Sequence, residues 1–147
     1  MFLAVAQQAA VGTSQYRVCG YAELEAQAAQ LGRFDTLVGN FALLEEPLAP
    51  TLNTLHGLLA EDGRLLIQTL HPWSVAAGEY QDGWRNESFA GFAGHWQPMP
   101  WYYRTLSSWL RALDMAGLRL VELQEPQHPQ SPQPQSLLLV AERKSPA

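Results

Sequence analysis

Residues 34–70 decide the fold and read FDTLVGNFALLEEPLAPTLNTLHGLLAEDGRLLIQTL. A compact apolar run stands near each end, at 34–39 and 64–70, and such runs are typical of strands buried on both faces. Between them two prolines suit the start of a helix whose leucines repeat at helical spacing, and Glu-Asp-Gly at 61–63 predicts a turn. Strand, helix and strand in fewer than 40 residues form a βαβ unit. We therefore expect a parallel pair of strands with a right-handed crossover.

Further elements are predicted on both sides of this unit. Residues 71–104 lack regular periodicity and carry glycines and prolines, which predicts a long loop or lid of functional importance. Helix-forming runs, apolar runs and a Pro- and Gln-rich connector account for the remainder. We predict helices at 2–11, 21–31 and 105–116 (the last capped by Thr105), and strands at 16–19, 118–123 and 136–143. The whole chain, 1–147, is expected to form one domain.

The composition excludes several classes of protein. Hydrophobic residue types make up 47% of the chain and charged types 16%, which predicts a packed globular core. The formal charge of −5 argues against nucleic acid as a partner, because phosphate binding uses clustered basic side chains. No run reaches the ~18 apolar residues of a membrane helix, so no membrane partner is expected. The single cysteine, Cys19, allows no internal disulfide and fits a cytoplasmic protein.

Four segments together resemble a known family. They read FDTLVGNFALL (34–44), LLAEDGRLLIQT (58–69), WYYRTLSSWLRALDMAGLRLVELQEP (101–126) and SLLLVAER (136–143). In order and spacing they are similar to the rear half of class I S-adenosylmethionine-dependent methyltransferases, more narrowly the small-molecule methyltransferases of the ubiquinone-biosynthesis type. The resemblance covers about residues 16–144. It implies an α/β, Rossmann-like sheet, mostly parallel with an antiparallel last strand, S-adenosylmethionine as cofactor, and a small-molecule substrate.

The chain departs from this family at its beginning. No Gly-x-Gly occurs anywhere in the sequence. In the family the glycine-rich turn, and the acidic residue that holds the ribose, would both precede Met1. We therefore expect a truncated domain that lacks the first two strands and is impaired in methyl transfer as this chain alone. The alternative is a non-catalytic, dimeric binding or interaction module derived from a methyltransferase.

The resemblance also implies residues on the cofactor side of a site. Ligands of open α/β sheets lie outside the carboxyl ends of the strands. Gly20 and Tyr21 match the position whose backbone meets the adenine, although the same residues also suit a plain helix start. Asn40 would contact the methionine part and Phe41 would form a wall. Asn40 is as well suited to a turn or helix cap.

The substrate side is expected from the end of strand 64–70 and from the lid. His71 is the candidate catalytic general base, since a neutral imidazole removes protons near neutral pH; the alternative is a histidine hydrogen-bonded to backbone at a strand end. Trp73, Trp101, Tyr102 and Arg104 are candidate substrate-binding residues. Arg104 would bind an acidic group or, alternatively, form a surface salt bridge with Glu87 or Asp82.

Two features of the lid and its surroundings leave alternatives open. All five tryptophans lie in the lid or on the next helix, where aromatic rings either line a pocket or fix the loop onto the sheet. His95 and His128 match no metal-ligand spacing with His71, so no metal is expected. Glu125 is expected to end a strand in solvent.

The missing first strands have a consequence for the sheet. Strand 34–39 would have an unpaired edge, and an exposed apolar edge is a pairing hazard. We expect either that 16–19 pairs beside 34–39, or that a homodimer forms across this exposed edge.

Overall fold

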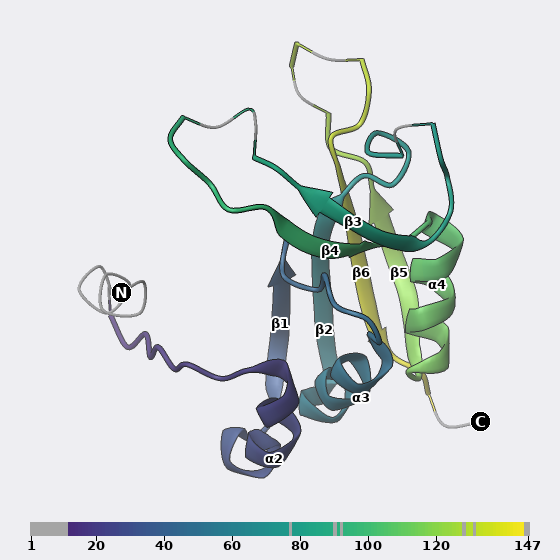
Figure 1. Ribbon diagram of the computed structural model, residues 1–147. Helices are drawn as coiled ribbons and strands as arrows, with labels where there is room; N and C mark the ends of the chain where they lie inside the picture. The colour runs from purple at the N-terminus through teal and green to yellow at the C-terminus, as the bar shows by residue number, and fades with distance from the viewer. Residues whose placement is uncertain are drawn as a thin grey trace.

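The computed structural model describes residues 12–76, 78–89, 91, 93–127, 129–130 and 132–145 (Figure 1). The helix predicted over 2–11 lies outside this range. The elements are α2 (Tyr21–Leu31), β1 (Phe34–Asn40), α3 (Ala49–Leu58), β2 (Leu59–Leu70), β3 (Gly83–Glu87), β4 (Met99–Tyr103), α4 (Leu106–Met115), β5 (Leu118–Gln124) and β6 (Ser136–Arg143). None of the described helices is long and apolar enough to span a membrane.

The four-stranded main sheet has the order β1-β2-β6-β5. β1 runs parallel to β2, with Leu37 opposite Leu65, and β6 is antiparallel to both of its neighbours. Three of the four strands therefore share one direction. The predicted sheet, mostly parallel with an antiparallel last strand, is confirmed.

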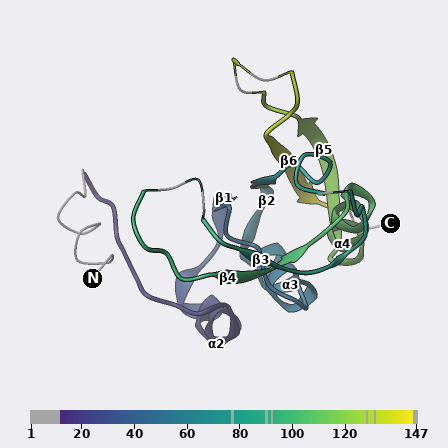
Figure 2. The same ribbon diagram turned by 45° about the horizontal axis from the view of Figure 1, so that its top comes forward.

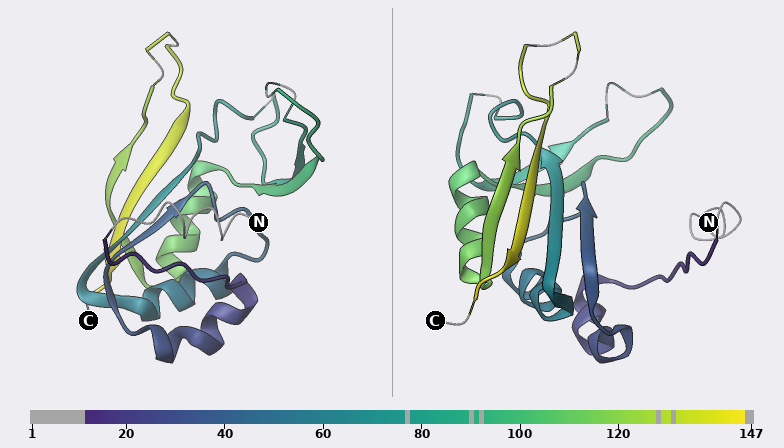
Figure 3. Two further views of the ribbon diagram at one scale, coloured as in Figure 1. Left: turned by 90° about the vertical axis from the view of Figure 1, so that its left-hand side faces the viewer. Right: turned by 180° about the vertical axis from the view of Figure 1, so that it is seen from behind.

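The helices α3 and α4 cover one face of this sheet, and α2 lies beside α3 (Figure 3). Their apolar faces meet the inward rows of the strands. The core contains Leu52 of α3, Leu113 of α4, Ile67 of β2 and Leu139 of β6, all fully buried or nearly so. Each such side chain contributes about 1.5–3 kcal/mol of burial free energy. This core holds the carboxyl ends of β1 and β2 in fixed positions.

β1 is an edge strand among the described residues, with β2 as its neighbour. Its Val38 is 66% exposed. The strand predicted at 16–19 is wrong: these residues form no ladder, and the alternative that they pair beside β1 is wrong as well. Most of this segment is exposed, including Val18, so water satisfies its backbone groups in place of a strand.

β2 begins five residues before its predicted start at Arg64. The Glu61–Gly63 segment, predicted as a turn, lies inside the strand. The pairing of β1 with β2 shifts register between Phe34 and Thr36, so an irregularity takes the place of the turn. A Cβ at Gly63 would lie 2.8 Å from the Phe34 carbonyl oxygen, so glycine is required by this close approach.

The carbonyl oxygen of Leu59, where α3 passes into β2, accepts two hydrogen bonds from distant arginines. Arg33 donates from just before β1 at 2.9 Å, and Arg143 donates from the end of β6 at 3.2 Å. Positive side chains near the carboxyl end of α3 also interact favourably with the negative end of its helix dipole.

The lid between β2 and α4 contains two strands where an irregular loop was predicted. β3 and β4 form an antiparallel pair that crosses near the carboxyl ends of β1 and β2 (Figure 2). The Tyr102 N–H donates to the Leu44 carbonyl at 2.8 Å, which ties β4 to the segment after β1. Arg85 lies over the Tyr103 ring at 3.7 Å and donates to the Val75 carbonyl.

Candidate functional site at the carboxyl ends of β1 and β2

The chain turns sharply where β1 ends. Asn40 is the last residue of the strand, and Phe41 follows with φ of 48°, a left-handed conformation that costs a bulky residue free energy. The Phe41 N–H donates to the Gln68 carbonyl of β2 at 2.8 Å, while its side chain stays exposed. Asn40 and Phe41 therefore stand at the rim, next to the end of β2.

The start of α2 lies against this turn. Gly20 caps the helix, and its carbonyl accepts the N–H groups of Glu23 and Leu24. The Tyr21 hydroxyl donates to the Ala42 carbonyl at 2.7 Å. Burial and then the nearby charge of Glu45 raise the pKa of Tyr21. The structure thus brings together the four residues that were predicted to border the cofactor.

His71 lies at the end of β2 and is buried. Its Nε2 is 2.8 Å from Oε1 of Glu125, which follows β5. Because a carboxylate only accepts, Nε2 carries the proton and Nδ1 is the basic nitrogen. Glu125 was predicted to end its strand in solvent; it is half-exposed and is a residue of this site that the sequence reasoning missed. Its place just beyond a strand that runs parallel to β2 was the available signal.

Arg104 is only 4% exposed and follows β4. Its Nη2 donates to Glu46 Oε2 at 2.6 Å and to the Glu45 carbonyl. Neither Glu87 nor Asp82, the two partners considered from the sequence, forms an ion pair with Arg104, although the charge of Arg104 helps to lower the pKa of Asp82. The lid folds over the segment after β1 and brings Arg104 to Glu46 instead. The guanidinium also lies 4.7 Å from the centre of the Tyr102 ring.

The aromatic side chains of the lid divide into two groups. Trp101 is buried and packs edge-on against Tyr103, whose hydroxyl donates to the Pro72 carbonyl at 2.9 Å. These rings fasten the lid to the end of β2. Trp73, by contrast, is 68% exposed and meets the Tyr80 ring at 5.9 Å between centres. Tyr102 meets the exposed Trp84 edge-on.

Four buried side-chain atoms of the described residues have no hydrogen-bond partner. They belong to three residues of this region and are Glu45 Oε1 and Oε2, His71 Nδ1 and Arg104 Nη1. Buried polar groups are normally paired, and exceptions require an explanation. All of them lie in segments that follow β1, β2 or β4, at the same end of the sheet.

The described residues contain no group of three or more His, Cys, Asp or Glu side chains placed to share an ion. His95 is exposed in the lid, and His128 lies outside the described part of the chain.

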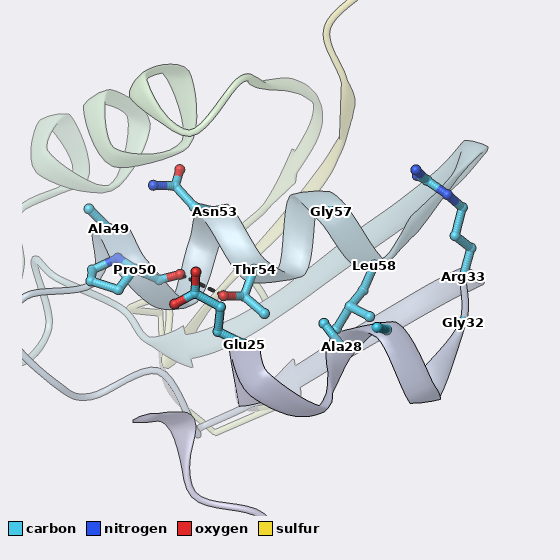
Figure 4. A pocket seen from close by; sticks show the side chains of 11 residues that line it. Glu25, Ala28, Gly32, Arg33, Ala49, Pro50, Asn53, Thr54, Gly57 and Leu58 are labelled. Atoms are coloured by element: carbon cyan, nitrogen blue, oxygen red, sulfur yellow. Dashed lines mark hydrogen bonds between the residues drawn. The ribbon is translucent and has the colours of Figure 1, made fainter. Parts of the chain in front are cut away.

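A hollow of about 730 Å³ lies elsewhere, between α2 and α3 (Figure 4). Small side chains dominate its walls, and the Thr54 hydroxyl already donates a hydrogen bond to the Pro50 carbonyl at 3.0 Å. None of the predicted site residues lines it; its lining is Glu25, Ala28, Ala29, Gly32, Arg33, Ala49, Pro50, Asn53, Thr54, Gly57 and Leu58.

Solved structures similar to this chain identify the fold. A protein from Listeria monocytogenes described as a putative S-adenosylmethionine-dependent methyltransferase matches with a TM-score of 0.72 at 16% identity, over 97% of this chain and 76% of that one. A methyltransferase from Mesorhizobium loti matches at 0.68 and 22%, over 96% and 75%. The 1,6-didemethyltoxoflavin-N1-methyltransferase of Burkholderia thailandensis matches at 0.63 and 20%, over 98% and 56%. No family model and no curated protein sequence matches.

The chain therefore has the fold of the class I S-adenosylmethionine-dependent methyltransferases. The region at the carboxyl ends of β1 and β2 is where such a sheet binds ligands. Tyr21, at the start of α2, and Phe41, in the turn after β1, lie at this end of the sheet, where the Tyr21 hydroxyl donates to the Ala42 carbonyl. The sequence supplies no Gly-x-Gly turn for the cofactor.

Proposed function

We propose that the protein is an S-adenosylmethionine-dependent methyltransferase that acts on a small molecule. The observation that carries the proposal is the fold, whose match covers nearly the whole chain. The gathering of Tyr21 and the β1 turn at the ligand-binding end of the sheet supports it. The toxoflavin-precursor methyltransferase among the similar structures acts on a small molecule, which supports that substrate class.

In this proposal Gly20, Tyr21, Asn40 and Phe41 hold the cofactor. The cofactor would supply a methyl group on a cationic sulfur, and the bonding electrons stay on sulfur as the acceptor's lone pair forms the new bond. The aromatic rings of Tyr21 and Phe41 favour a cation nearby. The strained turn at Phe41 keeps its ring at the rim.

The lid side binds and orients the acceptor. Trp73, Trp101, Tyr102 and Arg104 border it, and His71 Nδ1 accepts the proton that the acceptor loses. The Glu125 carboxylate accepts a hydrogen bond from His71 Nε2 and so fixes the orientation of the ring. Nδ1 is covered in this structure, so proton transfer requires the segment around His71 to open. The missing Gly-x-Gly turn leads us to propose that this chain alone transfers methyl groups slowly.

Calorimetry with S-adenosylhomocysteine tests the proposal. We expect micromolar binding by the 147-residue chain and weaker binding of ATP, which shares the adenosine but lacks the amino-acid part. Release of S-adenosylhomocysteine with a panel of small amines and phenols then tests the transfer. A chain that gives no heat with the homocysteine compound contradicts the cofactor site.

The second candidate is a non-catalytic dimeric module. The free edge of β1, with Val38 exposed, favours it. This candidate predicts a homodimer in sedimentation experiments and no binding of S-adenosylhomocysteine. Binding of that ligand would exclude this candidate. The homodimer and a cytoplasmic location stay predictions under either candidate.

A further inference from the structure

The Glu45 carboxylate is unusual among the described residues. Both of its oxygens are buried, and neither has a hydrogen-bond partner. Placing a charge out of water without a partner is costly, so a buried carboxylate without a hydrogen-bond partner requires an explanation, such as a bound ligand or ion. The nearby Tyr21 hydroxyl does not satisfy it, because that hydroxyl donates to the Ala42 carbonyl instead.

Glu45 lies at the junction of the two halves of the candidate site. On one side its charge acts on Tyr21, which belongs to the cofactor half. On the other side the neighbouring Leu44 carbonyl accepts the N–H of Tyr102, which belongs to the lid. A group bound at this carboxylate would therefore lie between the cofactor residues and the lid.

Arg104 supplies a second unpaired group, on a side chain that contacts the Glu45 backbone. Its Nη2 is used by Glu46 and by the backbone of Glu45, whereas its buried Nη1 donates to nothing in the described residues. The Glu45 carboxylate and Arg104 Nη1 do not pair with each other. The Glu45 carboxylate therefore lacks a hydrogen-bond donor, and Arg104 Nη1 lacks an acceptor.

We propose that Glu45 and Arg104 Nη1 together recognise a small molecule that carries an amino group close to an oxygen acceptor. The amino group donates to Glu45, and the oxygen accepts from Arg104. This inference rests on the proposed function and deepens it, because it names the acceptor substrate as an amine with an adjacent carbonyl or carboxylate. A charge-assisted bond at each end fixes the orientation of the molecule.

Thermal unfolding of the ligand-free protein gives the first test. Glu45→Gln removes an uncompensated charge, so we expect Tm to rise by about 2–6 °C. Glu45→Met, an apolar replacement, should raise Tm as well. The matched control is Glu46→Gln, whose carboxylate is paired with Arg104 and half-exposed, and which should lower Tm by about 1–3 °C. A fall in Tm for both Glu45 variants would overturn the proposal.

Binding of two matched probes gives the second test. Glycinamide carries an ammonium beside a carbonyl, and acetamide lacks the ammonium. We expect glycinamide, and not acetamide, to shift the backbone amide resonances of residues 44–46 and 102–104 at millimolar concentration. Glu45→Gln should weaken this binding about tenfold or more. Glu61→Gln, which removes an exposed carboxylate from the start of β2, should leave it unchanged.

The outcomes separate this inference from the proposed function. Equal shifts with acetamide, or unchanged glycinamide binding in Glu45→Gln, overturn the inference even where S-adenosylhomocysteine binds. Failure of S-adenosylhomocysteine to bind, with glycinamide bound in a Glu45-dependent way, overturns the cofactor proposal and leaves the amine site.

Discussion

The surroundings of His56 in the folded protein lower its pKa. His56 lies in the last turn of α3, and Gly117 approaches its ring. Burial lowers the pKa of His56, and the charges of Arg143 and then Arg33 lower it further. The folded protein therefore binds this proton less readily than the unfolded chain does.

A pH-dependence of stability follows from His56. Its stabilising contribution is complete above the unfolded pKa of about 6.5 and is lost as the pH falls toward the lower, folded pKa. We expect the free energy of unfolding in urea to be smaller at pH 5.5 than at pH 7.5, and His56→Gln to reduce this difference. His95→Gln, at an exposed position, should preserve it. An identical pH profile for the His56 variant would count against the interpretation.

At the scale of elements, the start of α4 depends on two side chains from different segments. The Thr105 hydroxyl accepts the Ser108 N–H at 3.3 Å, and the Thr105 N–H donates to Asp82 at 2.7 Å. Burial alone would raise the pKa of Asp82, but hydrogen bonds from Ser108 and Thr105 outweigh it and lower that pKa. The helix start is thus joined to the lid.

Removal of the cap should destabilise the protein measurably. We expect Thr105→Ala to lower the free energy of unfolding by about 1 kcal/mol, because a helix N–H loses its acceptor. Met115→Ala, at the exposed opposite end of α4, should change it by less than about 0.5 kcal/mol. Chemical denaturation of the three proteins checks this, and equal stability of the cap variant with the wild type would refute it.

Elements with strong local signals were predictable from the sequence. The helix at 21–31 has helix formers between two glycines and was predicted to the residue, and the cap at Thr105 was predicted too. The lid strands were not, because their pairing joins segments on either side of a long turn and places Trp84 opposite Tyr102. Such register depends on tertiary packing, which leaves no period in the sequence.

In the candidate site, too, some contacts could be expected from the sequence and others could not. The resemblance to the methyltransferase family placed the α2 start and the β1 turn at one site, and the Tyr21 hydroxyl joins them, although the described residues before α2 do not form the expected strand. The pairing of His71 with Glu125, and the unpaired carboxylate of Glu45, were not predictable, because each depends on where a loop folds over the sheet.

At the scale of the whole molecule, we expect the β1 edge to determine the state of association. Its backbone groups are free on one side in the described part of the sheet, and Val38 stands exposed beside them. We expect sedimentation velocity to show a dimer whose dissociation constant rises at least about tenfold in Val38→Lys, because edge lysines block strand pairing.

A lysine on the other edge provides the control. Val121 is exposed on β5, and Val121→Lys should leave the dimer intact. A wild-type protein that remains monomeric at high concentration would contradict pairing across β1.

The two arginines on the Leu59 carbonyl bear on how the chain folds. Arg33 is 26 residues away from that oxygen and Arg143 is 84 residues away, so one acceptor joins the segment before β1 to the end of β6. Closing such long loops is slow, and this junction is completed only after β6 has docked. The amino-terminal half therefore gains its full stability only when β6, the last strand of the chain, is in place. This dependence favours all-or-none unfolding over separate unfolding of the two halves.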